Sequence, residues 1–206
     1  MDLTLTNIAL LTFQHLYLSI IGTIVGGAVG FGLAVWLRSH TRWIALATGL
    51  AEVIQTIPGI ALLAFLLLAF GLGDTTLVIG LALYAILPVL QNTYEGLENV
   101  DPVYLGIGKG MGMTRGQIFR QIEVPLAFPL ILAGLRNALI ISIGVTTIGV
   151  FIGADGLGTF IYTGIQQYPY FQALLAGGIP AALLAILVEV VLTVLERRLS
   201  KNVSQR

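Results

Sequence analysis

An all-α bundle of transmembrane helices is the fold that this sequence predicts, on three observations. The 206 residues are 57% hydrophobic and 10% charged, whereas about 25% of the residues of a soluble domain are charged. Five apolar stretches approach or exceed the 20 or so residues with which a helix crosses a bilayer. Basic residues cluster only after the first, third and fifth stretches. We therefore expect a single transmembrane domain over residues 1–206.

The predicted spans are residues 16–37, 44–72, 76–91, 125–152 and 171–195. The third is short, and the second and fourth are long enough to contain a break. Ile57-Pro58-Gly59 predicts a break in the second span, because proline removes a backbone donor and bends a helix. Such a break is tolerated at membrane depth only if it is buried in protein or lines a cavity. Residues 55–59 are therefore a candidate wall of a pathway.

The basic residues predict the orientation of the chain. The N-terminus, the turn at 71–75 and the loop at 153–170 contain no Lys or Arg. The other three connecting or terminal segments contain Arg38, Arg42, Lys109, Arg115, Arg120, Arg197, Arg198, Lys201 and Arg206. An excess of Lys and Arg marks cytoplasmic loops. With five spans, we expect the N-terminus outside the cell and the C-terminus in the cytoplasm.

Glycines in the first span predict close helix contacts. Gly22, Gly26 and Gly30 lie four residues apart, and rows of small residues at this spacing let helix backbones approach each other. Packing within the bundle is the preferred interpretation, and a dedicated dimer motif is the alternative.

Several function classes find no support in the sequence. The formal net charge is zero, which gives no basic excess for nucleic acid. Cysteine is absent, and no His/Asp/Glu spacing indicates a metal site. His15 and His40 fall at predicted span ends, and Gly108-Lys109-Gly110 lacks the Ser or Thr of a phosphate-binding loop. We expect a protein that is not an enzyme and holds no metal or cofactor.

The stretch 95–124 is the one long polar segment of the sequence. Asp101-Pro102 is typical of a helix start, with aspartate as the N-cap and proline at the first helical position. Gly112 interrupts the pattern and Thr114 is a second candidate N-cap. The loop therefore predicts two short helices joined at a glycine corner, at the cytoplasmic membrane surface.

Within this loop, nine residues separate Gly112 from Ile122-Glu123-Val124-Pro125. This frame resembles the loop pattern E-A-A, three residues, G, nine residues, I-x-L-P of the permeases of bacterial binding-protein-dependent ABC importers. The E-A-A itself is replaced by Gly106-Ile107-Gly108. Residues 55–59 and the glycine-rich segment 153–158 also resemble segments of these permeases. The osmoprotectant branch, which imports glycine betaine, carnitine and choline, is the most similar, and methionine-type importers are near neighbours.

The resemblance implies a type I importer permease fold in the bacterial cytoplasmic membrane. It implies a coupling loop whose candidate residues are Gly106, Gly108, Met111, Gly112, Ile122 and Pro125. It also implies separate ATPase subunits that use ATP and Mg, a substrate-binding protein, and a second permease subunit, identical or different. Membrane lipid is the remaining partner.

The candidates for a translocation path are the break at Pro58 and the polar side chains Gln55, Thr56, Tyr84, Asn92, Thr146 and Thr147. Glu52, Arg136 and Glu189 are ionisable groups in apolar stretches, where charge is costly unless it is paired or wet. We expect Arg136 to pair with a glutamate and hold the bundle together. Two alternatives stay open: a permease for an amino acid such as methionine, and an ATP-independent secondary transporter with a proton relay through these charges.

Overall fold

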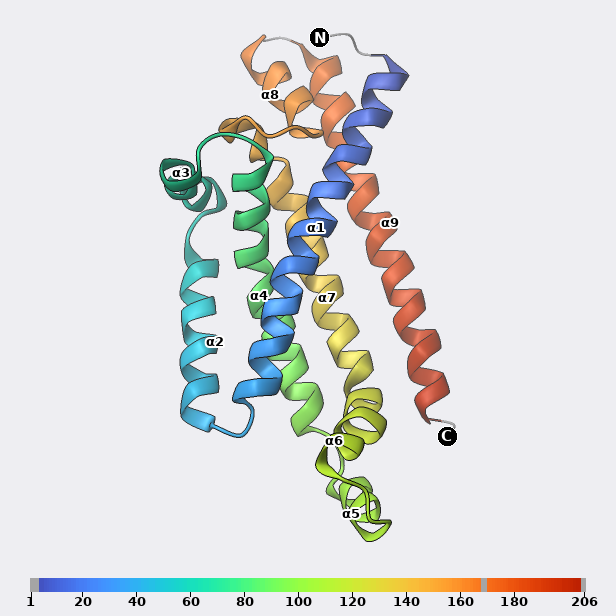
Figure 1. Cartoon of the computed structure of the whole chain (residues 1–206). Helices are drawn as coiled ribbons and strands as arrows, with labels where there is room; N and C mark the ends of the chain where they lie inside the picture. The colour runs from blue at the N-terminus through green and yellow to red at the C-terminus, as the bar shows by residue number, and fades with distance from the viewer. Residues whose placement is uncertain (1–3, 168–169, 205–206) are drawn as a thin grey trace.

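The structure is a computed structural model that describes residues 4–167 and 170–204, and over these residues it is all-helical. Four of the described helices are long and apolar enough to cross a membrane, and a bent pair makes a fifth candidate span. The long helices are α1 (Leu5–Leu37), α4 (Asp74–Glu98), α7 (Val124–Thr146) and α9 (Phe171–Ser204). Figure 1 shows them running between the same two ends of the molecule. The predicted fold class is confirmed.

Helix α4 is the central element, because α1 and α7 both pack along it. Its buried residues include Leu77, Leu81, Ala85 and Leu90. The glycine row of α1 faces this helix, and a Cβ added to Gly26 would overlap the carbonyl group of Ala82. The small residues therefore serve packing within the chain, as the preferred interpretation stated.

The predicted break in the second span is confirmed and is sharper than a bend. Helix α2 (Thr41–Thr56) ends just before Pro58, α3 (Gly59–Phe70) begins just after it, and the two axes differ by 101°. Ile57 is extended, with ψ 126°, because the residue before a proline is excluded from the helical region. The predicted second span, 44–72, is therefore this bent pair of helices, and α3 runs across the bundle rather than along it (Figure 1).

Four predicted span boundaries also differ from the structure, one of them the end of the fifth span, where α9 continues to Ser204. Helix α1 starts at Leu5, capped by the Thr4 hydroxyl, and α4 continues to Glu98. The polar turn after residue 91 stays helical because Thr93, Gly96 and Leu97 are buried against other helices. The fourth span ends earlier, at Thr146. It is followed by the 3-10 turn η2 (Gly149–Ile152) and by α8 (Gly158–Gln166), which packs on α9.

The two ends of the bundle carry different segments. The start of α1 and α8 lie at one end, and the α1–α2 connection and the end of α9 lie at the other (Figure 1). That second end also carries the helices α5 (Pro102–Gly110) and α6 (Arg115–Ile118). The predicted basic segments therefore gather at one end, although Arg206 lies outside the described residues.

Candidate functional site

Helices α5 and α6 form a projection beyond the end of the bundle (Figure 1). Both predicted helix starts are confirmed. The Asp101 carboxylate accepts a hydrogen bond from the Val103 amide at 2.8 Å. Thr114 and Gln117 form a reciprocal capping box with bonds of 2.7 and 3.3 Å. Both N-termini of the projection are thus satisfied by their own side chains, which stiffens it.

The corner between the two helices is built around Gly112. This residue has φ +77°, a backbone conformation that costs other residues free energy. The Met113 amide donates to the Gly108 carbonyl at 3.0 Å, and the Gly112 amide donates to the Lys109 carbonyl at 3.0 Å. These bonds close the end of α5 as a glycine C-cap does. The predicted corner is confirmed.

The other predicted glycines of the projection differ from one another in their surroundings. Gly108 is buried, and a Cβ there would lie 2.8 Å from Cδ1 of Ile122. Gly106 and Gly110 have no neighbouring atom within 4 Å of such a Cβ. Gly108 therefore lets α5 pack on Ile122, whereas Gly106 and Gly110 lie on the exposed side of α5. Pro125 lies in the first turn of α7.

The second short helix is not separate, contrary to the prediction. Helix α6 continues through a π-helical turn, η1 (Phe119–Glu123), directly into α7. The turn lies just before Pro125, whose ring and missing N–H disturb a regular α-helix at this point. The base of the projection is held by an ion pair of 2.7 Å between Arg38 and Glu123. The Arg38 guanidinium also lies 5.0 Å above the Phe119 ring.

One side of the projection is apolar and exposed. Its exposed side chains, each more than half accessible, are Val103, Tyr104, Ile107 and Met111. Leu105 and Met113, in contrast, are partly buried. We call the four exposed residues the docking face, since an apolar helix face of this kind fits a groove on another protein.

A polar recess lies on another part of the bundle, between α2, α4 and α7. It has a volume of about 390 Å³, and its lining residues are Gln55, Leu87, Pro88, Gln91, Asn92, Asn137, Ile140 and Ile141. The structure thus brings the predicted path residues Gln55 and Asn92 together. It adds Gln91, which the sequence placed at a span end, and Asn137. Sequence reasoning missed Asn137, although a polar residue within the apolar stretch 125–152 could have indicated it.

The amide nitrogens of the recess are engaged by the chain itself. Gln55 donates to the Tyr84 carbonyl at 3.0 Å, and Asn92 donates to the Pro88 carbonyl at 2.8 Å. Gln91 donates to the Glu52 carboxylate at 3.1 Å. Within the described residues these three amides form no further hydrogen bond, so the oxygen and the second N–H of each remain available.

The other predicted path residues lie apart from this recess. Thr56 and Pro58 are exposed at the break between α2 and α3, which we call the elbow. Tyr84 is buried, and its hydroxyl donates to the Ile57 carbonyl in this elbow. Thr146 is buried between α1 and α7 and bonded to Ser19. Thr147 lines a smaller recess beside α8. The seven predicted positions therefore do not form one continuous surface.

The predicted charge pairing is found for two of its three residues. Arg136 lies 3.8 Å from the Glu189 carboxylate on α9, and its Nη1 donates to the Thr193 hydroxyl at 2.9 Å. Glu196, which sequence reasoning missed, is closer, at 3.0 Å. Glu52 does not belong to this cluster. It lies on α2 and accepts a hydrogen bond from Gln91. The sequence could not show this, because hydropathy does not reveal which side of the bundle a residue faces.

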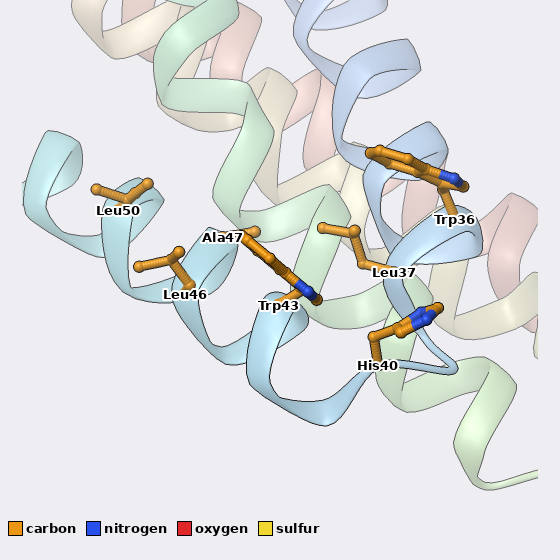
Figure 2. Close-up of a pocket in the computed structure, with 7 residues that line it drawn as sticks. All are labelled: Trp36, Leu37, His40, Trp43, Leu46, Ala47 and Leu50. Carbon is orange, nitrogen blue, oxygen red and sulfur yellow. The ribbon is translucent and has the colours of Figure 1, made fainter.

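A larger, apolar groove of about 490 Å³ lies at the corner of α1 and α2 (Figure 2). Its lining residues are Trp36, Leu37, His40, Trp43, Leu46, Ala47 and Leu50. The two indoles are largely exposed, at the end of the bundle where the basic residues gather. Tryptophan is typical of membrane–water boundaries, and the side-chain polar groups that line the groove are the His40 ring and the two indole N–H groups. We interpret it as a lipid-facing surface.

A membrane-length helical bundle with a polar recess and a stiff terminal projection defines the chain as a transport permease. The chain belongs to the family of binding-protein-dependent transport system inner membrane components, whose family model matches residues 22–201. The resemblance expected from the loop around Gly112 is therefore confirmed.

Individual relatives are more than two fifths identical to this chain over the aligned residues. The chain is 44% identical to the carnitine transport permease protein OpuCD of Listeria monocytogenes, over 94% of this chain and 87% of that protein. It is 43% identical to the glycine betaine/carnitine/choline transport system permease protein OpuCD of Bacillus subtilis, over 91% of this chain and 82% of that protein.

Solved structures share the fold. The MetNI methionine ABC transporter in an inward-facing conformation matches with a TM-score of 0.82 at 18% identity, covering 95% of this chain and 97% of that chain. An amino acid ABC transporter solved with histidines matches with a TM-score of 0.76 at 23% identity, covering 94% of both chains. The fold is therefore that of a type I ABC importer permease.

Proposed function

We propose that this chain is a permease subunit of an ATP-driven importer of a small osmoprotectant such as glycine betaine, choline or carnitine. One observation carries this proposal. Three relatives, 42–44% identical over at least 91% of the chain, are permeases whose names give carnitine, choline or glycine betaine as the transported compound. The chain is a transport subunit and not an enzyme.

The docking face supports coupling to a separate ATPase. Four apolar side chains on a capped helix are exposed beyond the bundle, and seating them in a groove would remove this apolar surface from water. A rigid projection also passes on the movement of its partner as a rigid body. ATP and Mg would be held by the ATPase. The part of this chain that contacts the ATPase would be the docking face.

The positions of the basic residues support a cytoplasmic location for the projection. Arg38, Lys109 and Arg197 come from three segments that reach the same end of the bundle, and positive charge is retained on the cytoplasmic side. The N-terminus, α8 and the loop 153–158 then face the outside of a bacterial cytoplasmic membrane. A substrate-binding protein would dock on that outer end.

The amide-lined recess supports a path at a boundary between two permease subunits. It is open along one face of this chain, so a second permease subunit, identical or related, is needed to enclose it. The side-chain carbonyl oxygens of Gln55, Gln91 and Asn92 would solvate the cationic end of a quaternary ammonium compound, because its nitrogen carries no N–H donor. Weak contacts suit a path, because a solute must also leave it.

Neither alternative gains support. A proton relay needs Glu52 near Arg136 and Glu189, and Glu52 lies instead in contact with Gln91. The methionine transporter is only 18% identical to this chain. Similarity at this level supports a shared fold and gives no evidence about the substrate.

Uptake of labelled glycine betaine, choline and carnitine tests the proposal, in vesicles that contain the chain with its ATPase, its binding protein and any second permease subunit. We expect uptake to require ATP. It should be lost in an assembled Gly112→Val complex, because valine disfavours φ +77°. Gly112→Asn and Gly110→Ala are the matched controls, because asparagine tolerates this conformation and Gly110 has free space. Uptake that follows a proton gradient without ATP would contradict the proposal.

A further inference from the structure

His15 is a buried histidine that the proposed path and docking face do not use. Helix α1 begins at Leu5, so the ring lies about 15 Å into the helix and not at a span end, as the sequence suggested. Its side chain is 0% exposed. Burying a polar ring is costly unless it is hydrogen-bonded, and His15 meets this condition through two partners far away in sequence.

The two ring nitrogens contact different elements. Nε2 lies 2.9 Å from the carbonyl oxygen of Ile143 on α7. Nδ1 lies 3.4 Å from the backbone amide of Leu157, at the end of the outer loop 153–158. A carbonyl only accepts and an amide N–H only donates. The ring is therefore neutral, with its hydrogen on Nε2, and it joins α7 to the outer loop.

The outer loop is shaped to fit this ring. Gly156 has φ +149°, and a Cβ there would lie 3.1 Å from His15 Nδ1. Elsewhere the loop is tied to the start of α4, where the Asp155 amide donates to the Asp74 carboxylate at 3.2 Å. The loop is thus held between α1 on one side and α4 on the other.

Beneath the ring, a row of hydroxyl groups joins α1 to α7. Ser19 lies 2.9 Å from the Thr146 hydroxyl, and Thr23 donates to the Ser142 hydroxyl at 3.0 Å. All four of these side chains are buried. His15 is the outermost member of this polar seam, so the seam reaches the outer loop through its ring.

We propose that His15 is a positioning residue that holds the outer loop 153–158 against α1 and α7 in the shape that receives the substrate-binding protein. This inference rests on the proposed function, which places the loop on the outer face. Without the hydrogen bond from Leu157 to Nδ1, the loop would keep its bond to Asp74 on α4 and lose its bond to the polar seam between α1 and α7.

Two isosteric variants separate the two bonds of the ring. In His15→Asn the amide oxygen takes the place of Nδ1 and can still accept from Leu157. In His15→Gln the amide nitrogen takes the place of Nε2 and can still donate to Ile143, but the acceptor for Leu157 is lost. The chain contains no cysteine, so an Asp155→Cys background gives a single, exposed site for a spin label.

The label is measured in the complete transporter in lipid vesicles, first without binding protein. We expect a more mobile label in His15→Gln and a mobility like that of the parent in His15→Asn. The binding-protein concentration for half-maximal ATPase stimulation should rise roughly three- to tenfold in His15→Gln, as loss of one hydrogen bond implies. It should stay within about twofold in His15→Asn.

Equal mobility in the two variants, or a more mobile label in His15→Asn, would overturn the inference. A mobile loop with unchanged binding-protein dependence would also overturn it. If neither variant assembles, Gly156→Ala decides, because its methyl group would displace the loop from an intact ring: a mobile label supports the inference and an immobile one overturns it. The mobility measurement needs no substrate, so failure of the proposed transport function would be seen separately, as absence of uptake in the parent.

Discussion

The hydroxyl group of Tyr84 on α4 donates a hydrogen bond of 2.5 Å to the carbonyl oxygen of Ile57, in the elbow between α2 and α3. Breaking a helix at membrane depth frees backbone groups that lipid cannot satisfy. Tyr84 satisfies one of them, and in return its own carbonyl accepts from Gln55 at 3.0 Å. The right-angle elbow is therefore held on α4 by two side-chain bonds.

We predict that Tyr84→Phe destabilises the chain. The variant removes the donor and leaves the Ile57 carbonyl without it, which costs about 1–3 kcal/mol of unfolding free energy. For a chain of this size each kcal/mol lowers Tm by roughly 2–4 °C, measurable by thermal unfolding in detergent. Tyr17→Phe is the control, because that ring lies on the exposed surface of α1. Equal Tm values for the two variants would contradict the role of the elbow bond.

We predict that Gly26→Ala reduces the yield of folded protein and that Gly32→Ala does not. The new methyl group at position 26 would overlap the Ala82 carbonyl, whereas position 32 has no neighbouring atom within 4 Å. Overpacking of this kind costs about 1–3 kcal/mol, while alanine in an open helical position gains roughly 0.5–1 kcal/mol over glycine. Size-exclusion chromatography of the detergent-solubilised variants measures the folded fraction. Similar losses in both would show that the contact with α4 is not what limits the fold.

Features that depend on neighbouring residues were predictable from the sequence. The break at Pro58, the caps at Asp101 and Thr114 and the corner at Gly112 each depend on a few consecutive residues, and all four are present in the structure. The π-helical turn before Pro125 was missed, because its apolar residues recur at ordinary helical spacing.

Features that depend on the faces of different helices were not predictable. Hydropathy identifies Glu52 and Arg136 as charges in apolar stretches, but it does not show that they lie on different sides of the bundle. It also gave no reason to connect Arg136 with Glu196, or His15 with Leu157, because the first pair meets only when α7 packs on α9 and the second only when the outer loop packs on α1.

We predict that Asn137→Leu lowers the rate of ATP-dependent uptake about tenfold, the effect of roughly 1.4 kcal/mol, without changing assembly. Asn137 lines the amide recess, and leucine there would remove a polar group from the proposed path. Gln172→Leu is the matched control, because α9 contributes no residue to that recess. Basal ATPase activity should be the same in all three proteins. Normal uptake by an assembled Asn137→Leu complex would move the path away from the recess.

We predict that Arg136→Met lowers the yield of folded protein more than the triple variant Arg136→Met/Glu189→Gln/Glu196→Gln does. Removing the cation alone leaves two carboxylates on α9 without their partner, whereas the triple variant removes all three charges. A fully buried pair that loses one partner costs about 3–5 kcal/mol.

For this cluster, the loss of unfolding free energy should be smaller than that of a fully buried pair. The side chains of Arg136, Glu189 and Glu196 are 20%, 46% and 25% exposed, so we expect about 1–3 kcal/mol, reduced by solvent. Folded yield and Tm measure the difference, and Glu52→Gln serves as the control because Glu52 contacts Gln91 on α4 instead. If the single and triple variants fold equally well, the charges do not hold α7 to α9. The contact between these helices would then depend on the apolar cluster of Ile143, Leu184 and Val188.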